Sequence, residues 1–207
     1  LAQALAAGGG RWRVLAHRAS AYMLTGEFKR AAEDYEEAVK IAGDAWPRGR
    51  ALANGARGAE DAVKRGIKAQ RVVRLVRGAR AMARDDYVGA LAHYDAADLG
   101  KSDFENVPGL RTVVADGYLN LARIYATMSR VVIEAAVDSL PTLSRCTANF
   151  PYMKDDADGT GRATETAFKF LRQAVRLGGV DRAALRTDPD FRGIRGESRW
   201  RTILEDR

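Results

Sequence analysis

Apolar and polar residues follow helical spacing through Arg18–Gly43, and we predict two helices here that are joined by a tight turn at Gly26. In the second half of this stretch, Ala31, Tyr35 and Ala38 recur at steps of three and four residues and therefore share one helical face. The opposite face is predicted to carry the charged residues Glu33, Asp34, Glu36, Glu37 and Lys40. The pattern predicts an amphipathic second helix.

The first helix carries a matching apolar stripe, formed by Leu15, Ala19 and Tyr22. Small residues at Ala19 and Ala31 would let the two backbones approach closely, while Tyr22 and Tyr35 would fill the gaps beside them. We predict one packed helical hairpin that leaves an apolar edge uncovered. Such a unit cannot bury that edge alone, so further hairpins are expected to stack on it.

The same arrangement returns 59 positions further along the chain, with a turn at Asp85-Asp86. The matched pairs are Ala19 with Gly78, Tyr22 with Ala81, Phe28 with Tyr87, Ala31 with Ala90, Tyr35 with Tyr94, and Ala38 with Ala97. We therefore predict antiparallel helix pairs over residues 12–42 and 71–99. Between them, Trp46-Pro47 ends a helix and Pro47 suits the first turn of a new one, so residues 48–83 are expected to form one long helix or two consecutive helices.

A third hairpin is predicted with its two helices separated by an insertion. First-helix positions recur at Tyr118, Leu121, Ala122 and Tyr125, and second-helix positions recur at Ala167, Leu171 and Ala174. The insertion, residues 131–162, begins with an apolar helical part and continues as a loop that is predicted to run through Gly161. Gly178-Gly179 is a helix stop signal.

Small residues at two helix positions, aromatic residues around them and a Gly or Asp turn form the signature of tetratricopeptide repeats (TPRs), which this chain resembles. The resemblance implies an all-α array of antiparallel helical hairpins, an α-solenoid, over residues 11–207, with the last repeat split by the insertion. Residues 1–10 are expected to be a linker stub. Arg74, Arg77 and Arg80 depart from the family pattern, which usually has apolar or small residues there.

The C-terminal third carries a narrower set of motifs. They are Tyr118–Ala122, Ala167–Ala174, Asp188-Pro189-Asp190-Phe191, Ile194-Arg195 and Trp200. This part resembles the closing segment of the TPR regions that follow the kinase domain in planctomycete-type bacterial serine/threonine protein kinases. Because the chain opens at Leu1 rather than Met, we expect it to be a fragment of a longer protein. The resemblance implies a C-terminal adaptor of such a kinase, whose job is protein–protein interaction.

We predict no catalytic residue in this chain. The sequence has no Gly-rich phosphate loop before a β-strand Lys, no His-Arg-Asp catalytic loop and no Asp-Phe-Gly motif. The Asp188-Pro189-Asp190 motif has a sufficient explanation as a helix start, because Pro suits the first turn and carboxylates favour a helix N-terminus.

We also predict no metal site and no cofactor. His17 and His93 lie in different predicted hairpins, without local ligands in metal-binding spacing. Asp156, Asp158, Gly159 and Glu165 match positions of a calcium loop, but Lys154 replaces its first carboxylate, so an exposed insertion is the better interpretation. A single cysteine, Cys146, and the lack of an uncharged apolar run of about 18 residues favour a reducing, cytoplasmic compartment.

Positive charge is concentrated in residues 48–80, which contain ten basic and two acidic residues, within a chain of formal charge +7. On a continuous helix, Arg57, Lys64, Lys68 and Arg71 would share one basic face. A solvated helix face is the simplest explanation, and an acidic protein segment is the partner that such a face would attract. A basic module that binds nucleic acid or another polyanion is the alternative, although the stretch lacks aromatic residues for base stacking.

The TPR resemblance implies a concave surface, lined by first helices, that binds a protein or peptide ligand. The positions expected to face this peptide groove are Arg13, Ser20, Met23, Met82 and Arg123. They do not form the Lys/Asn carboxylate clamp of cochaperones. The sequence therefore leaves two candidate surfaces, the peptide groove and the basic face.

Overall fold

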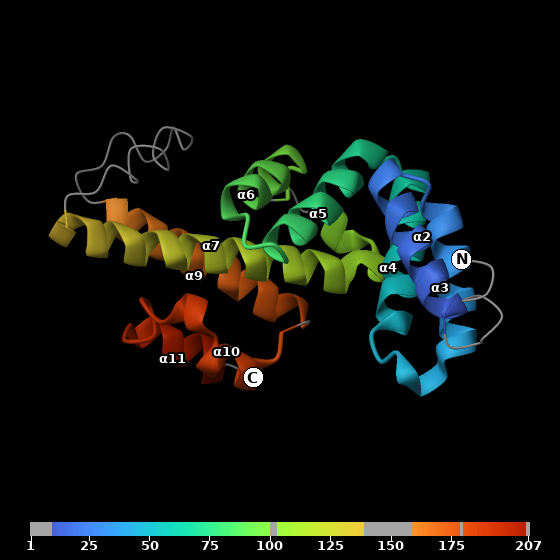
Figure 1. Ribbon diagram of the computed structural model, residues 1–207. Helices are drawn as coiled ribbons and strands as arrows, with labels where there is room; N and C mark the ends of the chain where they lie inside the picture. Colours follow the sequence, from blue (N-terminus) through green and yellow to red (C-terminus); the bar gives the residue numbers. More distant parts are fainter. Residues whose placement is uncertain (1–9, 100–102, 139–158, 179, 206–207) are drawn as a thin grey trace. The chain divides into compact units, whose positions relative to one another are not determined.

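A computed structural model describes residues 10–99, 103–138, 159–178 and 180–205, and the regular structure in these ranges is helical, without a strand (Figure 1). The chain is an all-α array of helical hairpins, as predicted. It divides into two compact units, which are described separately below. Unit 1 comprises Leu1–Arg80 and Ala92–Val114, and unit 2 comprises Ala81–Leu91 and Ala115–Arg207.

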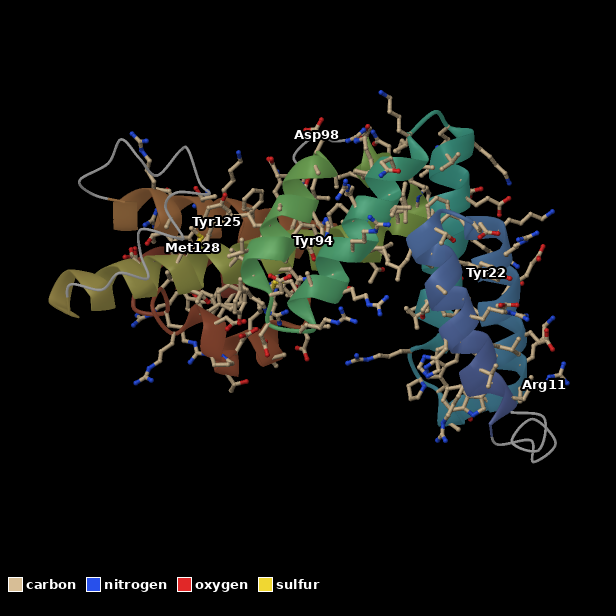
Figure 2. All side chains as sticks on the ribbon, turned by 45° about the horizontal axis from the view of Figure 1, so that its top comes forward. Arg11, Tyr22, Tyr94, Asp98, Tyr125 and Met128 are labelled. Carbon is tan, nitrogen blue, oxygen red and sulfur yellow. The ribbon has the colours of Figure 1, made fainter. Side chains whose placement is uncertain are left out.

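The first hairpin of unit 1 consists of α2 (Arg11–Thr25) and α3 (Phe28–Ala42), which confirms the predicted helix pair. The helices are joined at Gly26, whose φ of 86° lies in the left-handed region that glycine adopts without strain. The N–H of Gly26 donates to the carbonyl oxygen of Tyr22 and so closes the end of α2. Figure 2 labels Arg11 and Tyr22 near the two ends of this helix. The predicted stripes of small and aromatic residues pack between the helices, where Ala19, Ala31 and Ala38 are fully buried.

The prediction that Asp34 lies on the polar face of α3 is wrong, because its side chain faces α2 and the residue is only 7 % exposed. Arg18 on α2 donates two hydrogen bonds to it, from Nε to Oδ2 at 2.6 Å and from Nη2 to Oδ1 at 2.8 Å. A paired, bidentate geometry offsets the cost of removing a carboxylate from water. The hydrogen bond to Asp34 also raises the pKa of Arg18.

Two consecutive helices, rather than one long helix, follow the first hairpin. After the 3₁₀ turn η1 (Gly43–Ala45), α4 spans Gly49–Lys64 and α5 spans Ala69–Met82. They are separated at Gly66, which has a φ of 91°. The sequence predicted Pro47 in the first turn of the next helix, but Pro47 lies two residues before the start of α4.

α4 packs its small residues against α3 and against the 3₁₀ turn η3 (Pro108–Leu110). A second 3₁₀ turn, η2 (Phe104–Asn106), directly precedes η3 in the chain. Ala56, Ala59 and Ala62 are fully buried on this face. The crossing with η3 is so close that the backbones of Gly58 and Gly109 are in contact.

α6 (Tyr87–Ala96) follows α5 after the predicted turn at Asp85-Asp86, where Asp85 adopts a φ of 58°. Within unit 1, Arg71 of α5 contacts Ala97, Arg74 contacts His93 and Gly78 contacts Tyr94. Arg74 is later in the chain than Arg71, but its partner His93 is earlier than Ala97, the partner of Arg71. The two segments therefore run antiparallel. The 59-residue correspondence with the first hairpin holds in burial as well, since Ala90 and Ala97 are fully buried like Ala31 and Ala38.

The core of unit 2 is built from the predicted third hairpin and the C-terminal motifs. α7 (Arg111–Asp138) begins in unit 1 and continues into unit 2, where α9 (Gly159–Leu177), α10 (Arg182–Thr187), η5 (Pro189–Phe191) and α11 (Ser198–Glu205) follow. The buried core of unit 2 contains Ala122, Ala126, Ala167, Phe168, Leu171, Leu185, Phe191, Ile194, Trp200, Ile203 and Leu204. The motifs that carried the narrower resemblance therefore include residues that hold this core together.

The insertion is shorter than predicted at its C-terminal end. α9 begins at Gly159, so the loop predicted through Gly161 is helical from that residue on. Glu165, the last position of the calcium-like pattern, lies on this helix and forms an ion pair with Arg199. Lys154, Asp156, Asp158 and Cys146 lie outside the described residues.

Candidate functional site

Three of the predicted groove residues, Arg13, Ser20 and Met23, lie on α2 in unit 1. Arg13 is exposed, and its guanidinium lies 5.2 Å from the centre of the Trp12 ring. Ser20 is also exposed, and its hydroxyl donates to the carbonyl of Ala16 at 2.9 Å and lies 2.9 Å from the Tyr35 hydroxyl. Burial raises the pKa of Tyr35.

The prediction for Met23 is wrong, because this residue is only 8 % exposed. Met23 follows Ala19 by one helical turn and so belongs to the same buried stripe of α2. It packs within the hairpin and is not available for a ligand.

The other two predicted groove residues, Met82 and Arg123, belong to unit 2. Met82 is half-buried. The side chain of Arg123 is 30 % exposed and binds the Asp188 carboxylate, with Nη2 2.8 Å and Nε 2.9 Å from Oδ2. Arg123 also donates to Oδ1 of Asn120 at 3.2 Å. These contacts give Arg123 a structural role in unit 2.

The Asp188-Pro189-Asp190 motif caps a helical turn, as the sequence predicted. Oδ1 of Asp188 accepts a hydrogen bond from the N–H of Asp190 at 3.1 Å, and Pro189 opens η5. The Tyr87 hydroxyl donates to Oδ1 of Asp190 at 3.5 Å. Burial, followed by the Asp190 charge, raises the pKa of Tyr87. The two carboxylates are therefore held by structural partners.

The predicted basic face does not form, because it assumed a continuous helix through residues 57–71. The helix ends at Lys64 and restarts at Ala69, which changes the direction in which later residues project. Arg57 forms an ion pair with Glu36 of α3, and Lys64 forms one with Glu60 at 2.8 Å. These hydrogen-bonded partners lower the pKa of Glu36 and raise the pKa values of Arg57 and Lys64. Lys68 is exposed in the connection between the helices.

Arg71, the fourth residue of the predicted face, connects three segments of unit 1, and its side chain is only 19 % exposed. Its Nε donates to the carbonyl of Ala97 at 2.9 Å, and Nη2 donates to that of Asp98 at 3.2 Å. Nη1 donates to Oδ2 of Asp103 at 2.5 Å, and the guanidinium lies 4.8 Å from the centre of the Phe104 ring. The hydrogen bond from Arg71 lowers the pKa of Asp103.

A groove between α3 and α4 consists of two adjoining hollows, of about 370 Å³ and about 350 Å³. Both are lined by Lys29, Glu60 and Lys64. The remaining lining residues are Gly26, Glu27, Phe28, Arg30 and Val63 in one hollow and Ala32, Glu33, Glu36, Arg57 and Asp61 in the other. Three ion pairs cross or border the groove, from Arg30 to Glu27, Arg57 to Glu36 and Lys64 to Glu60. The groove neutralises most of its own charge.

Sequence reasoning missed an aromatic cluster on unit 1. The rings of Trp12 and Trp46 have centres 5.3 Å apart and planes tilted by 33°, and Tyr35 lies 6.1 Å from Trp46. Trp12 and Trp46 are separated by 34 positions, which is the length of one tetratricopeptide repeat. That one-repeat spacing was the signal in the sequence that could have drawn attention to this pair.

Comparison with known protein families bears on the first hairpin. The tetratricopeptide-repeat family model matches residues 13–44. This range contains most of α2 and the whole of α3, together with the Gly26 turn. TPRs commonly bind proteins or peptides, so the match indicates a hairpin of an interaction module. Searches of curated proteins and of solved structures found no match to the chain.

The described residues contain no group of three or more His, Cys, Asp or Glu side chains that could hold a metal ion. Among the same ranges, no helix combines the length and apolar character needed to cross a membrane.

Proposed function

We propose that this chain is a protein–protein interaction module that binds a protein or peptide ligand through unit 1. The observation that carries the proposal is the α2–α3 hairpin, which matches the TPR family and packs through the small and aromatic positions of that repeat. Stacking of α4 on α3 supports it further, because it extends the hairpin into an array with exposed helix faces. The ligand would contact exposed residues such as Arg13 and Ser20.

The alternative of polyanion binding through the basic face has little support. Three of its four residues, Arg57, Lys64 and Arg71, are engaged with carboxylates of the chain itself. A phosphate backbone would have to compete with these partners. We therefore favour a protein ligand over nucleic acid.

At a finer level, we propose that the module is the C-terminal adaptor of a bacterial serine/threonine protein kinase. The support for this step is the resemblance of the C-terminal motifs, including Asp188-Pro189-Asp190, to that class of kinases. The reading frame upstream of Leu1 provides the test. A kinase catalytic domain encoded there would support the adaptor role, and another type of domain would contradict it.

The interaction proposal is tested with the purified chain immobilised as bait in a lysate of its native host. Each captured protein is then purified and titrated against the free chain by calorimetry. A saturable complex of defined stoichiometry is expected. If no purified candidate binds the free chain, the proposed function is wrong.

A further inference from the structure

The aromatic cluster on unit 1 is held in place by the start of α4. The Trp46 ring lies against Gly49, the first residue of this helix, so closely that a β-carbon there would be 2.5 Å from a ring atom. Trp12 reaches the cluster from the first turn of α2. It follows Arg11 in the chain, which Figure 2 labels at this end of the hairpin. Both indoles remain partly exposed. The chain thus presents two large, rigidly supported aromatic rings at its surface.

Three arginines lie in the segments that carry these rings or that contact them. The guanidinium of Arg13 lies over Trp12, and Arg48 and Arg50 flank Gly49 in sequence. All three are exposed, and none forms an ion pair with a carboxylate within the described residues. This distinguishes them from neighbouring arginines, because Arg11 is paired with Glu37 at 2.5 Å.

We propose that Trp12, Trp46, Arg13, Arg48 and Arg50, named here the aromatic–arginine patch, bind an acidic segment of a partner protein. The proposal rests on the proposed function and names its partner class. Guanidinium groups match the geometry of carboxylates and can donate to both oxygens. Trp and Arg are also the residues that most often dominate protein interfaces, since they offer large contact area with a polar group attached. The surplus of unpaired positive charge sets the sign of the partner.

Other occupants fit the patch less well. Residues 1–9 of the chain contain no carboxylate and cannot neutralise the arginines. Nucleic acid would use the rings for base stacking. The two indoles contact one another at 5.3 Å, however, and leave no slot for a base between them.

The test uses the whole chain and a defined probe, the fluorescein-labelled peptide Gly-Glu-Glu-Phe-Glu-Glu-Gly, with a control peptide in which every Glu is Gln. Binding is measured by fluorescence anisotropy at low and moderate salt. We expect the acidic peptide to bind more tightly than its control. In the triple variant Arg13→Gln, Arg48→Gln, Arg50→Gln, its affinity should fall about tenfold, because three exposed ion pairs with the peptide are lost and each of them contributes only modestly.

A matched control variant removes the same charge from unit 2. Arg172, Arg186 and Arg192 are exposed, so Arg172→Gln, Arg186→Gln, Arg192→Gln should leave peptide affinity within about twofold of wild type. The far-UV circular dichroism melt of both variants verifies folding. Trp46→Phe, which keeps a ring against Gly49, should weaken binding without unfolding the hairpin. An equal loss of affinity in both triple variants would show a general charge effect and overturn the patch.

Three further results would also overturn the patch. One is that a 12-nucleotide oligouridine binds through the same arginines with higher affinity than the peptide. Another is a dimer, seen by sedimentation velocity, that the patch variant abolishes, since the occupant would then be a second copy. The third is a wild-type chain that binds captured partner proteins but not the acidic peptide, which leaves the proposed function standing. A chain that binds the peptide but no partner protein would instead contradict the proposed function.

Discussion

The crossing of α4 and η3 provides a sharp test of the packing in unit 1. A β-carbon at Gly58 would lie 2.3 Å from the carbonyl carbon of Gly109 and 2.6 Å from both the Gly109 oxygen and the nitrogen of Leu110. All three are main-chain atoms, which cannot rotate away as a side chain can. The substitution Gly58→Ala therefore requires α4 or the η3 turn to shift.

The expected effect combines two opposing contributions. Overpacking of a filled contact typically costs about 1–3 kcal/mol, and replacing Gly by Ala inside a helix gains about 1 kcal/mol. Because three main-chain atoms lie well inside contact distance, we take the upper part of the first range and expect a net loss of about 1–2 kcal/mol. Gly55→Ala on the same helix is the matched control, since its β-carbon would meet one methyl of Val113 at 3.2 Å. There the helical gain should prevail, and the change should be neutral or stabilising by up to about 1 kcal/mol.

The assay is urea unfolding of the three proteins, followed by circular dichroism at 222 nm with the slope compared between variants. We expect the midpoint of Gly58→Ala to fall below that of wild type and the midpoint of Gly55→Ala to equal or exceed it. If Gly58→Ala is as stable as Gly55→Ala, the close backbone contact between α4 and η3 does not exist in solution.

Three other predictions follow from individual contacts. Ala31→Leu should lower the stability of the first hairpin by about 1–3 kcal/mol through overpacking, and an unchanged melting temperature would contradict the tight crossing. Because Arg71 lowers the pKa of Asp103, their pair should stabilise the fold above the unfolded carboxyl pKa of about 3.9 and lose this contribution as pH falls through the lower folded value. Asp103→Asn should therefore flatten the acid side of a plot of stability against pH, measured by urea unfolding. Asp188→Ala should cost about 1–3 kcal/mol from the lost cap and ion pair, and a double-mutant cycle with Arg123→Ala should show positive coupling in thermal melts.

Periodicity alone was enough to predict the helical hairpins. Small side chains at Ala19, Ala31 and Ala38 are required wherever two backbones approach closely, so their spacing encodes both the helices and their contact. The recurrence of the pattern at Gly78 and Ala90 predicted the second pair for the same reason. These positions depend on local geometry, which a sequence displays directly.

Charged partners could not be predicted in this way, because they are distant in sequence. Arg18 and Asp34 are separated by 16 positions, Arg71 and Asp103 by 32, and Arg123 and Asp188 by 65. Helical periodicity contains no information about such pairs, and a charged residue is assigned to the solvent face by default. The predictions for Asp34 and Arg71 failed for this reason. The basic face failed for a second reason, since a break at Gly66 separates residues that a continuous helix would align.

The arginines that depart from the TPR pattern show why surface charge must be sorted by partner before it is interpreted. Arg77 donates to the carbonyl oxygen of Leu24 at 3.3 Å, near the end of α2, where helix carbonyls lack intrahelical donors. Arg74 lies 3.3 Å from Nδ1 of His93 and joins α5 to α6. Both residues therefore bind parts of unit 1 to one another, at positions where a smaller residue would leave those contacts unmade. The number of basic residues in residues 48–80 therefore overstates how many of them are available to bind a partner. A binding site should be sought where exposed arginines have no carboxylate beside them.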